Sequence, residues 1–141
     1  MNTSAIETIR YDGIHSAVAV EQHPNGVVVL RLSGIDIGEF GDLPMNAIAE
    51  RIEKGGPVQL FIDARAVAGA SIEVSGDWAQ WLSRNRQHLR RIDMLTGSRF
   101  IEVTADFVRR FADLQGLMWI YTDAGSFDET VDKAIEQCPR S

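Results

Sequence analysis

The chain has 141 residues, of which 45% are hydrophobic and 24% are charged. This length favours one domain, and the composition is typical of a globular domain that folds around its own core. The net charge of −6 at pH 7 disfavours nucleic acid and anionic membranes as partners, because both are polyanions that the chain repels.

Sequence signals for export or membrane insertion are not found. No apolar run approaches the roughly 18 residues that a membrane-spanning helix needs. The first ten residues lack the basic start and long apolar core of a signal peptide. The single cysteine, Cys138, cannot form an intramolecular disulfide and fits a reducing compartment. We therefore predict a cytoplasmic location, and for Cys138 a packing role on the last helix.

Charge is unevenly distributed along the chain. Residues 76–110 contain seven arginines and four acids, a local balance of +3, so the remainder carries −9. This segment forms either a basic face on an acidic molecule or a solvated helix surface with ordinary ion pairs. The second interpretation is favoured, because charge runs usually solvate a face.

The first half of the chain predicts a β-hairpin followed by a helix. Residues 1–13 are expected to be a tail or a frayed first strand. Residues 15–22 alternate in hydropathy, and residues 26–34 are rich in branched side chains. The segment His23-Pro24-Asn25-Gly26 between them is a strong hairpin signal, because Asn-Gly tolerates positive φ. A helix over 42–54 follows, with Asp42 as its cap and Pro44 in its first turn.

Strands and helices alternate from residue 58 onward. Val58–Ala64 is a nearly continuous apolar run, typical of a strand covered on both faces. A loop of small residues then leads to a helix that begins near Ser75, whose hydroxyl caps the free backbone N–H groups, with Asp77 complementing the helix dipole. Residues 92–95 predict the next strand.

The last third of the chain continues this alternation. A helix capped by Thr104 is expected to stop at Gly116, and residues 117–121 predict a strand. Ser126 and Glu129 predict a capping box at the start of the last helix. The helix capped by Thr104 is expected to bury four apolar side chains: Phe107, Val108, Phe111 and Leu114.

This order predicts an α/β fold with a single mixed β-sheet, a β-hairpin followed by βαβαβα, and helices packed on it. Strands that alternate with helices favour a mostly parallel sheet with right-handed crossovers. The hairpin adds an antiparallel pair at one side. We predict one domain over residues 14–141.

No catalytic or metal-binding signature is found. The three histidines have no companion at metal-ligand spacing. A nucleophile elbow and a P-loop are both missing, and Gly34-Ile35-Asp36-Ile37-Gly38 lacks the spacing of a dinucleotide fingerprint. We therefore predict a chain that is not an enzyme and that uses no metal and no cofactor.

The candidate binding residues lie between the strand at 58–64 and the helix at 75–89. Asp63 either caps the following loop or pairs with Arg65, or it lies beside a switch hydroxyl. Ser75 is a helix cap or a phosphorylation site, because a helix N-terminus tolerates an anion. Ser71 is the second candidate serine. Two tryptophans, Trp78 and Trp81, are expected in the core, and an exposed one would be a partner anchor.

The element order, the V-V-V-L-R-L-S-G strand, the L-F-I-D strand and Ser75-Gly76 resemble the STAS domain of anti-sigma-factor antagonists and their SpoIIAA-like relatives. The resemblance covers nearly the whole chain from about residue 15. It implies that Asp63 corresponds to the strand-end acid and Ser75 to the serine that a partner kinase phosphorylates. Val74 stands where these domains carry an acid before that serine.

The resemblance implies a regulatory domain that binds a protein partner, such as an anti-sigma factor or a kinase. The predicted contact residues are Asp63, Arg65, Gly76, Asp77 and Trp78. A module that binds a small ligand between helices and sheet is the alternative. An enzyme that uses Asp63, Ser75 or Arg65 is the least favoured hypothesis, because no base is fixed by the sequence.

Overall fold

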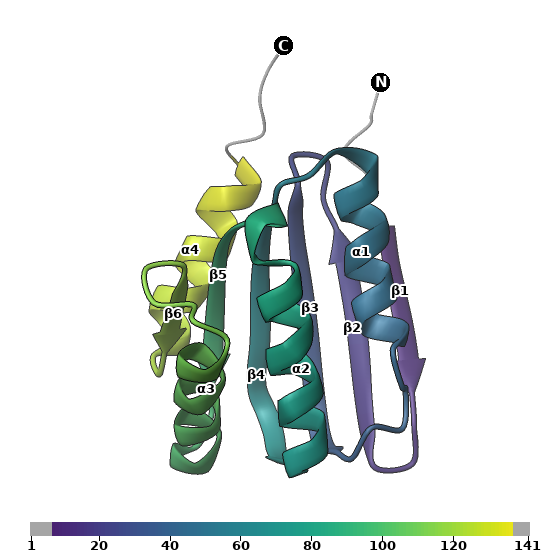
Figure 1. Ribbon diagram of the computed structural model, residues 1–141, viewed down its shortest axis with the longest axis vertical. Coiled ribbons are helices and arrows are strands. Elements are labelled where there is room, and N and C mark those ends of the chain that lie inside the picture. Colours follow the sequence, from purple (N-terminus) through teal and green to yellow (C-terminus); the bar gives the residue numbers. More distant parts are fainter. Residues whose placement is uncertain (1–6, 137–141) are drawn as a thin grey trace.

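A six-stranded β-sheet with helices on both faces is seen in the computed structural model, which describes residues 7–136 (Figure 1). Across the sheet the strands lie in chain order: β1 (Glu7–Asp12), β2 (Ser16–Gln22), β3 (Val27–Asp36), β4 (Val58–Ala70), β5 (Leu89–Thr96) and β6 (Met118–Tyr121). The helices are α1 (Leu43–Gly55), α2 (Ile72–Arg84), α3 (Arg99–Phe111) and α4 (Ala124–Glu136). Cys138 lies outside the described residues.

The predicted α/β fold with one mixed sheet is confirmed. Strands β1, β2 and β3 pair antiparallel, and β3 to β6 pair in parallel. The predicted turn before Gly26 joins β2 to β3, and Gly26 has φ +81°. Within the segment expected to be a tail or a frayed strand, Glu7–Asp12 form an edge strand paired with β2 along its whole length.

The two faces of the sheet carry separate apolar cores. Helices α1, α2 and α3 cover one face, and α4 covers the other at the β5–β6 side (Figure 1). Branched side chains on alternate strand positions supply both cores, as expected for a sheet covered on both faces. On the α4 face, Phe127 is fully buried and meets Phe61 edge-on, with ring centroids 5.9 Å apart.

Strand β4 is longer than the sequence predicted, so the expected loop after Asp63 is wrong. The strand extends to Ala70 because β3 continues beside it, with Ser33 opposite Ala66 and Asp36 opposite Ala70. Small residues have weak strand propensity. In β4, pairing with β3 provides hydrogen bonds for the backbone groups of these small residues. These long-range hydrogen bonds outweigh the weak strand propensity.

The capping residues of three helices also differ from the predicted ones, by three to six positions. Ser71, and not Ser75, caps α2, because its hydroxyl accepts the Val74 N–H at 3.1 Å. In the same way Ser98 rather than Thr104 caps α3. At α4 the Asp123 carboxylate accepts the Ser126 N–H at 2.9 Å, in place of the Ser126–Glu129 capping box.

The predictions for α1 and α3 are corrected in two further details. Asp42 precedes α1 as expected, but its side chain makes no capping hydrogen bond. Helix α3 carries two apolar stripes of the same period, and the sequence prediction mixed them: Val108 and Leu114 are buried as expected, but the two phenylalanines are not. Phe107 and Phe111 are 53% and 60% exposed. The buried stripe consists of Ile101, Ala105 and Val108.

The contrast between two phenylalanines gives a stability prediction. Phe127→Ala should lower the free energy of unfolding by about 3–5 kcal/mol, because it removes a fully buried ring and leaves a cavity. Phe107→Ala, the matched control on the exposed stripe, should cost less than about 1 kcal/mol. Urea denaturation followed by circular dichroism measures both values. Equal losses would contradict the assignment of the two stripes.

Candidate functional site

The predicted contact residues lie on opposite faces of the sheet. Asp63 and Arg65 are on the α4 face, where the Arg65 guanidinium pairs with Asp128 of α4. Ser75 and Trp78 are on α2 and line a cavity on the other face. The sheet therefore separates the two groups, and the start of α2 does not form one surface with Asp63.

Asp63 belongs to a row of charges that crosses three strands. Its carboxylate accepts hydrogen bonds from Arg31 Nη1 at 2.8 Å and from Arg65 Nε at 3.0 Å, and Arg31 also donates to Glu21 at 2.7 Å. Burial opposes the charged form of Arg31, but hydrogen bonds and attraction from Glu21 and Asp63 outweigh it and raise the Arg31 pKa. Of the alternatives for Asp63, the structure shows the pairing with Arg65, whose backbone N–H also donates to the carboxylate at 3.2 Å. The loop that Asp63 was expected to cap is part of β4.

A second buried acid, Asp93 on β5, went unnoticed in the sequence. It is fully buried, and it accepts hydrogen bonds from Arg91 Nε at 3.0 Å and from the Tyr121 hydroxyl at 2.7 Å. The Arg91 guanidinium also stacks over the ring of Trp119, 4.1 Å from its centroid. The charges of Asp93 and Asp63 are thus balanced by arginines and hydrogen bonds. The ion pairs within residues 76–110 agree with the interpretation of that segment as a solvated surface with ordinary ion pairs.

The first turns of α2 carry the remaining candidates. The Ser71 hydroxyl is engaged by the Val74 N–H, and the Ser75 hydroxyl donates to the Ser71 carbonyl at 3.1 Å. Asp77 is exposed. Trp78 is half-buried, whereas Trp81 is buried in the core, and the two rings meet edge-on at 6.1 Å.

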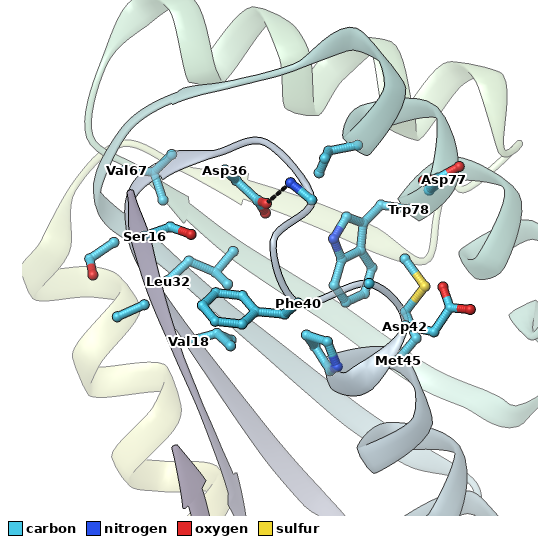
Figure 2. Close-up of a pocket in the computed structure, with 16 residues that line it drawn as sticks. Ser16, Val18, Leu32, Asp36, Phe40, Asp42, Met45, Val67, Asp77 and Trp78 are labelled. Carbon is cyan, nitrogen blue, oxygen red and sulfur yellow. Dashed lines mark hydrogen bonds between the residues drawn. The ribbon is translucent and has the colours of Figure 1, made fainter. Parts of the chain in front are cut away.

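Two hollows flank Trp78, one on each side of α2. The first lies between α2, α3 and the sheet, has a volume of about 80 Å³ and is lined almost entirely by apolar side chains, among them Leu82 and Ile101. The second, also about 80 Å³, lies between α1 and α2 (Figure 2). Figure 2 shows the Trp78 and Phe40 rings in this hollow, with Asp36, Asp42 and Asp77 around them.

A carboxylate clamp fixes the loop beside the second hollow. Glu39 accepts hydrogen bonds from the N–H groups of Ile14 and His15, and from both the N–H and the hydroxyl of Ser16, at 2.8–3.2 Å. The Ser16 hydroxyl bond, together with these backbone bonds, lowers the Glu39 pKa and outweighs the opposing effect of burial. The clamp ties the β1–β2 turn to the loop that follows β3.

Comparisons with known proteins find similarity in structure but not in sequence. No protein-family model matches the chain, and no curated protein matches it. A structure of an uncharacterized protein of the DUF3478 family with a SpoIIAA-like fold, from Shewanella loihica PV-4, superposes with a TM-score of 0.58 at 13% identity, over 86% of this chain and 98% of that chain.

The second similar structure is the anti-sigma factor antagonist SpoIIAA in its unphosphorylated form. Its TM-score is 0.52 at 18% identity, over 80% of this chain and 95% of that chain. The chain therefore has a SpoIIAA-like, or STAS-like, fold, as the sequence resemblance predicted.

Two classes of site find no support within residues 7–136. No group of three or more His, Cys, Asp or Glu side chains in that range could hold a metal ion. Among the helices of the same range, none is long and apolar enough to cross a membrane.

The clamp at Glu39 gives a pH prediction. A lowered folded-state pKa means that the stability contributed by Glu39 is present above the ordinary glutamate pKa of about 4.3 and is lost as pH falls through the lowered value. Glu39→Gln should therefore lower the melting temperature at pH 7 and flatten its decline at acidic pH. Thermal melts from pH 7 to pH 3 test this, with exposed Glu50→Gln as the control. Parallel curves for Glu39→Gln and wild type would contradict it.

Proposed function

We propose that this chain is a non-enzymatic regulatory domain that binds a protein partner around the start of α2. One observation carries the proposal. Five large apolar side chains are exposed at the end of the molecule where β3 and β4 stop and α2 begins: Ile14, Ile35, Ile37, Leu43 and Ile72. We call these residues the apolar end patch.

The apolar end patch is drawn from four separate segments that contacts hold together. The β1–β2 turn contributes Ile14, whose N–H is held by Glu39. The end of β3 and α2 are joined by the hydrogen bond from the Ser71 N–H to the Asp36 carbonyl, at 3.0 Å. Single exposed apolar residues are ordinary, but five large ones at the same end of the molecule favour an interaction surface.

Two side chains of the patch are exposed to an unusual degree. Ile14 is 89% and Ile72 is 91% exposed, although isoleucine is among the residues most often fully buried. Gly76, Asp77 and Trp78 of the predicted contact set lie beside this patch on α2. Asp63 and Arg65 belong to the ionic row on the other face, so the proposed contact surface does not include them.

One of the two similar structures supports a regulatory role. One protein of this fold is described as an anti-sigma factor antagonist in its unphosphorylated form. By analogy, the partner proposed for this chain is an anti-sigma factor or a kinase. Fold analogy alone does not assign function, so the exposed patch carries the argument.

Serine phosphorylation is the proposed control of this contact, at Ser75 or, as the second site, at Ser71. Both hydroxyls lie in the first turns of α2, where free N–H groups and the helix dipole favour an anion. A phosphate here would add about −1.5 to −2 charge beside Glu73 and Asp77. That change would alter the surface that the partner meets.

The partner-binding prediction compares two variants that each replace an exposed apolar side chain with serine. Ile72→Ser lies in the apolar end patch, and the control Phe107→Ser lies on the exposed face of α3. Proteins that the wild-type chain captures from its native host are identified by mass spectrometry and then titrated individually against each purified variant. Ile72→Ser should weaken binding roughly 10- to 100-fold, because a buried isoleucine contributes about 1.5–3 kcal/mol. Phe107→Ser should leave binding unchanged.

The same titration tests the serine switch. Ser75→Asp should weaken binding at least tenfold, and Ser75→Ala, which removes only the hydroxyl, should not. Mass spectrometry of the chain after incubation with the captured kinase locates the modified serine. Modification at neither Ser75 nor Ser71, with Ser75→Asp binding like wild type, would disprove the switch.

The apolar cavity between α2, α3 and the sheet supports a second candidate, a small-ligand module. Its wall is formed by Leu30, Ile62 and Met94 of the sheet, Leu82 of α2, and Ile101 and Ala105 of α3. Dry apolar cavities bind small apolar molecules. The volume of about 80 Å³ suits one small apolar group.

Methyl NMR with benzene as the probe tests this second candidate. Benzene should shift the methyl signals of Ile62, Leu82 and Ile101 but not those of Ile37 and Ile72. Ala105→Leu, which fills the cavity, should abolish these shifts. Shifts at the exposed isoleucines instead, or shifts that persist in Ala105→Leu, would exclude the cavity as the binding site.

A further inference from the structure

The apolar end patch is surrounded by carboxylates that have no cationic partner. Five acids, which we call the carboxylate rim, lie at the end of β3, on the loop between β3 and α1, and on the first two turns of α2: Asp36, Glu39, Asp42, Glu73 and Asp77. Within residues 7–136 none of the five forms a salt bridge. Asp63, Asp93 and Asp106 are paired with arginine, whereas some exposed acids outside the rim, such as Glu50 and Glu53, also form no salt bridge in that range.

Helix dipoles account for only part of this charge. The starts of α1, α2 and α3 lie toward this end of the molecule (Figure 1), and each supplies about half a positive charge. Three such ends offset less than half of the five formal negative charges. The carboxylate rim therefore presents a net negative field to whatever docks on the patch.

Cations without a salt bridge gather at the opposite end of the molecule. Lys54 lies at the end of α1, Arg84 at the end of α2, and Arg90 near the start of β5. None of the three appears in an ion pair among the described residues. Acids that form no salt bridge within residues 7–136, such as Glu50 and Glu53 of α1, lie at that end too, so its charges offset one another. The rim carboxylates form no salt bridge with any cation of the described residues.

The hollow beside Trp78 combines both features at close range. Its floor is apolar, with Phe40 and Trp78, and Figure 2 shows Asp42 and Asp77 beside the Trp78 ring. Asp36 Oδ1 accepts the Gly38 N–H at 3.1 Å, so this rim carboxylate is held in place by the loop. A cationic side chain that enters the hollow meets carboxylates at the rim and aromatic faces on the floor, a combination that favours lysine or arginine.

We infer that the partner docks through a basic amphipathic segment, with apolar side chains on the apolar end patch and lysine or arginine side chains at the carboxylate rim. This inference rests on the proposed function, because it names the chemistry of the partner at that site. The same field repels nucleic acid, anionic membranes and acidic peptides. Electrostatic complementarity of this kind sets specificity and association rate.

Two labelled 18-residue helical peptides test the inference. They share one leucine face and carry either lysine or glutamate on the polar face, and fluorescence anisotropy measures their binding to the full chain. The lysine peptide should bind at least tenfold more tightly than the glutamate peptide, and it should weaken as salt is raised from about 50 to 300 mM. Equal affinities for the two peptides would overturn the inference, as would binding to vesicles of anionic phospholipid.

Neutral variants separate a local effect from bulk charge. Asp36→Asn/Asp42→Asn/Asp77→Asn should weaken the lysine peptide at least tenfold. Glu50→Gln/Glu53→Gln/Asp132→Asn, which removes the same charge from exposed acids outside the rim, should not. Asp42→Asn/Asp77→Asn keeps the Asp36 loop contact and serves where the triple variant fails to fold. Equal weakening by both triple variants would overturn the inference.

Ile72→Ser in the same assay distinguishes this inference from the proposed function. If Ile72→Ser loses binding and the rim variants bind unchanged, the proposed interaction surface is retained. The inference that the partner segment is basic is then overturned. Binding that neither set of variants affects would overturn both proposals. Weakening by both sets is the expected result.

Discussion

The pairing of β3 with β4 beyond the end of β5 is the constraint on which the rest of the structure depends. The two strands remain paired from Val27 opposite Gln59 to Asp36 opposite Ala70, and their register shifts at two places between these ends. The continued pairing of β3 with β4 requires β5 to leave the sheet beside Arg65. Glycine allows this at position 97, because a Cβ atom there would lie 2.3 Å from the Arg65 carbonyl oxygen. The long strand places Asp63 inside the sheet and carries the start of α2 to its far end.

The sheet then divides structural charges from the proposed functional surface. On the α4 face, Asp63 and Asp93 are buried and their charges are balanced by arginines, so breaking either pair would leave an unpaired buried charge. The five acids of the carboxylate rim are exposed, apart from the half-buried Asp36, and none of them forms a salt bridge within residues 7–136. Asp63, the acid that is most distinctive in the sequence, thus supports the fold, and exposed or half-buried acids near the start of α2 surround the exposed patch.

Trp78 links the two proposed kinds of binding. It forms a wall of both hollows on either side of α2, and the hollows also share Leu32, Asp36, Val67 and Val74. A group that enters the inner cavity would therefore contact the helix that carries the outer surface. The partner surface and the apolar cavity are neighbouring parts of one region of the molecule.

Much of the fold was predictable from the sequence. Hydrophobic periodicity and the Asn25-Gly26 turn predicted the element types, their order and the mixed sheet, because these signals depend on local spacing. Boundaries failed at Ser75, Thr104 and Ser126. Each of these three residues follows, within a few positions, another residue whose side chain can also cap a helix. Local chemistry does not choose between the two capping residues.

The candidate site was predicted less well. The sequence by itself placed it at the start of α2, because helix-start residues and the apolar strand before them are local signals. Only the tertiary structure decided which residues share that surface: strand pairing put Asp63 on the opposite face, and loop packing gathered the apolar end patch from segments up to 58 residues apart. Exposure and charge compensation depend on such long-range contacts, and no local pattern encodes them.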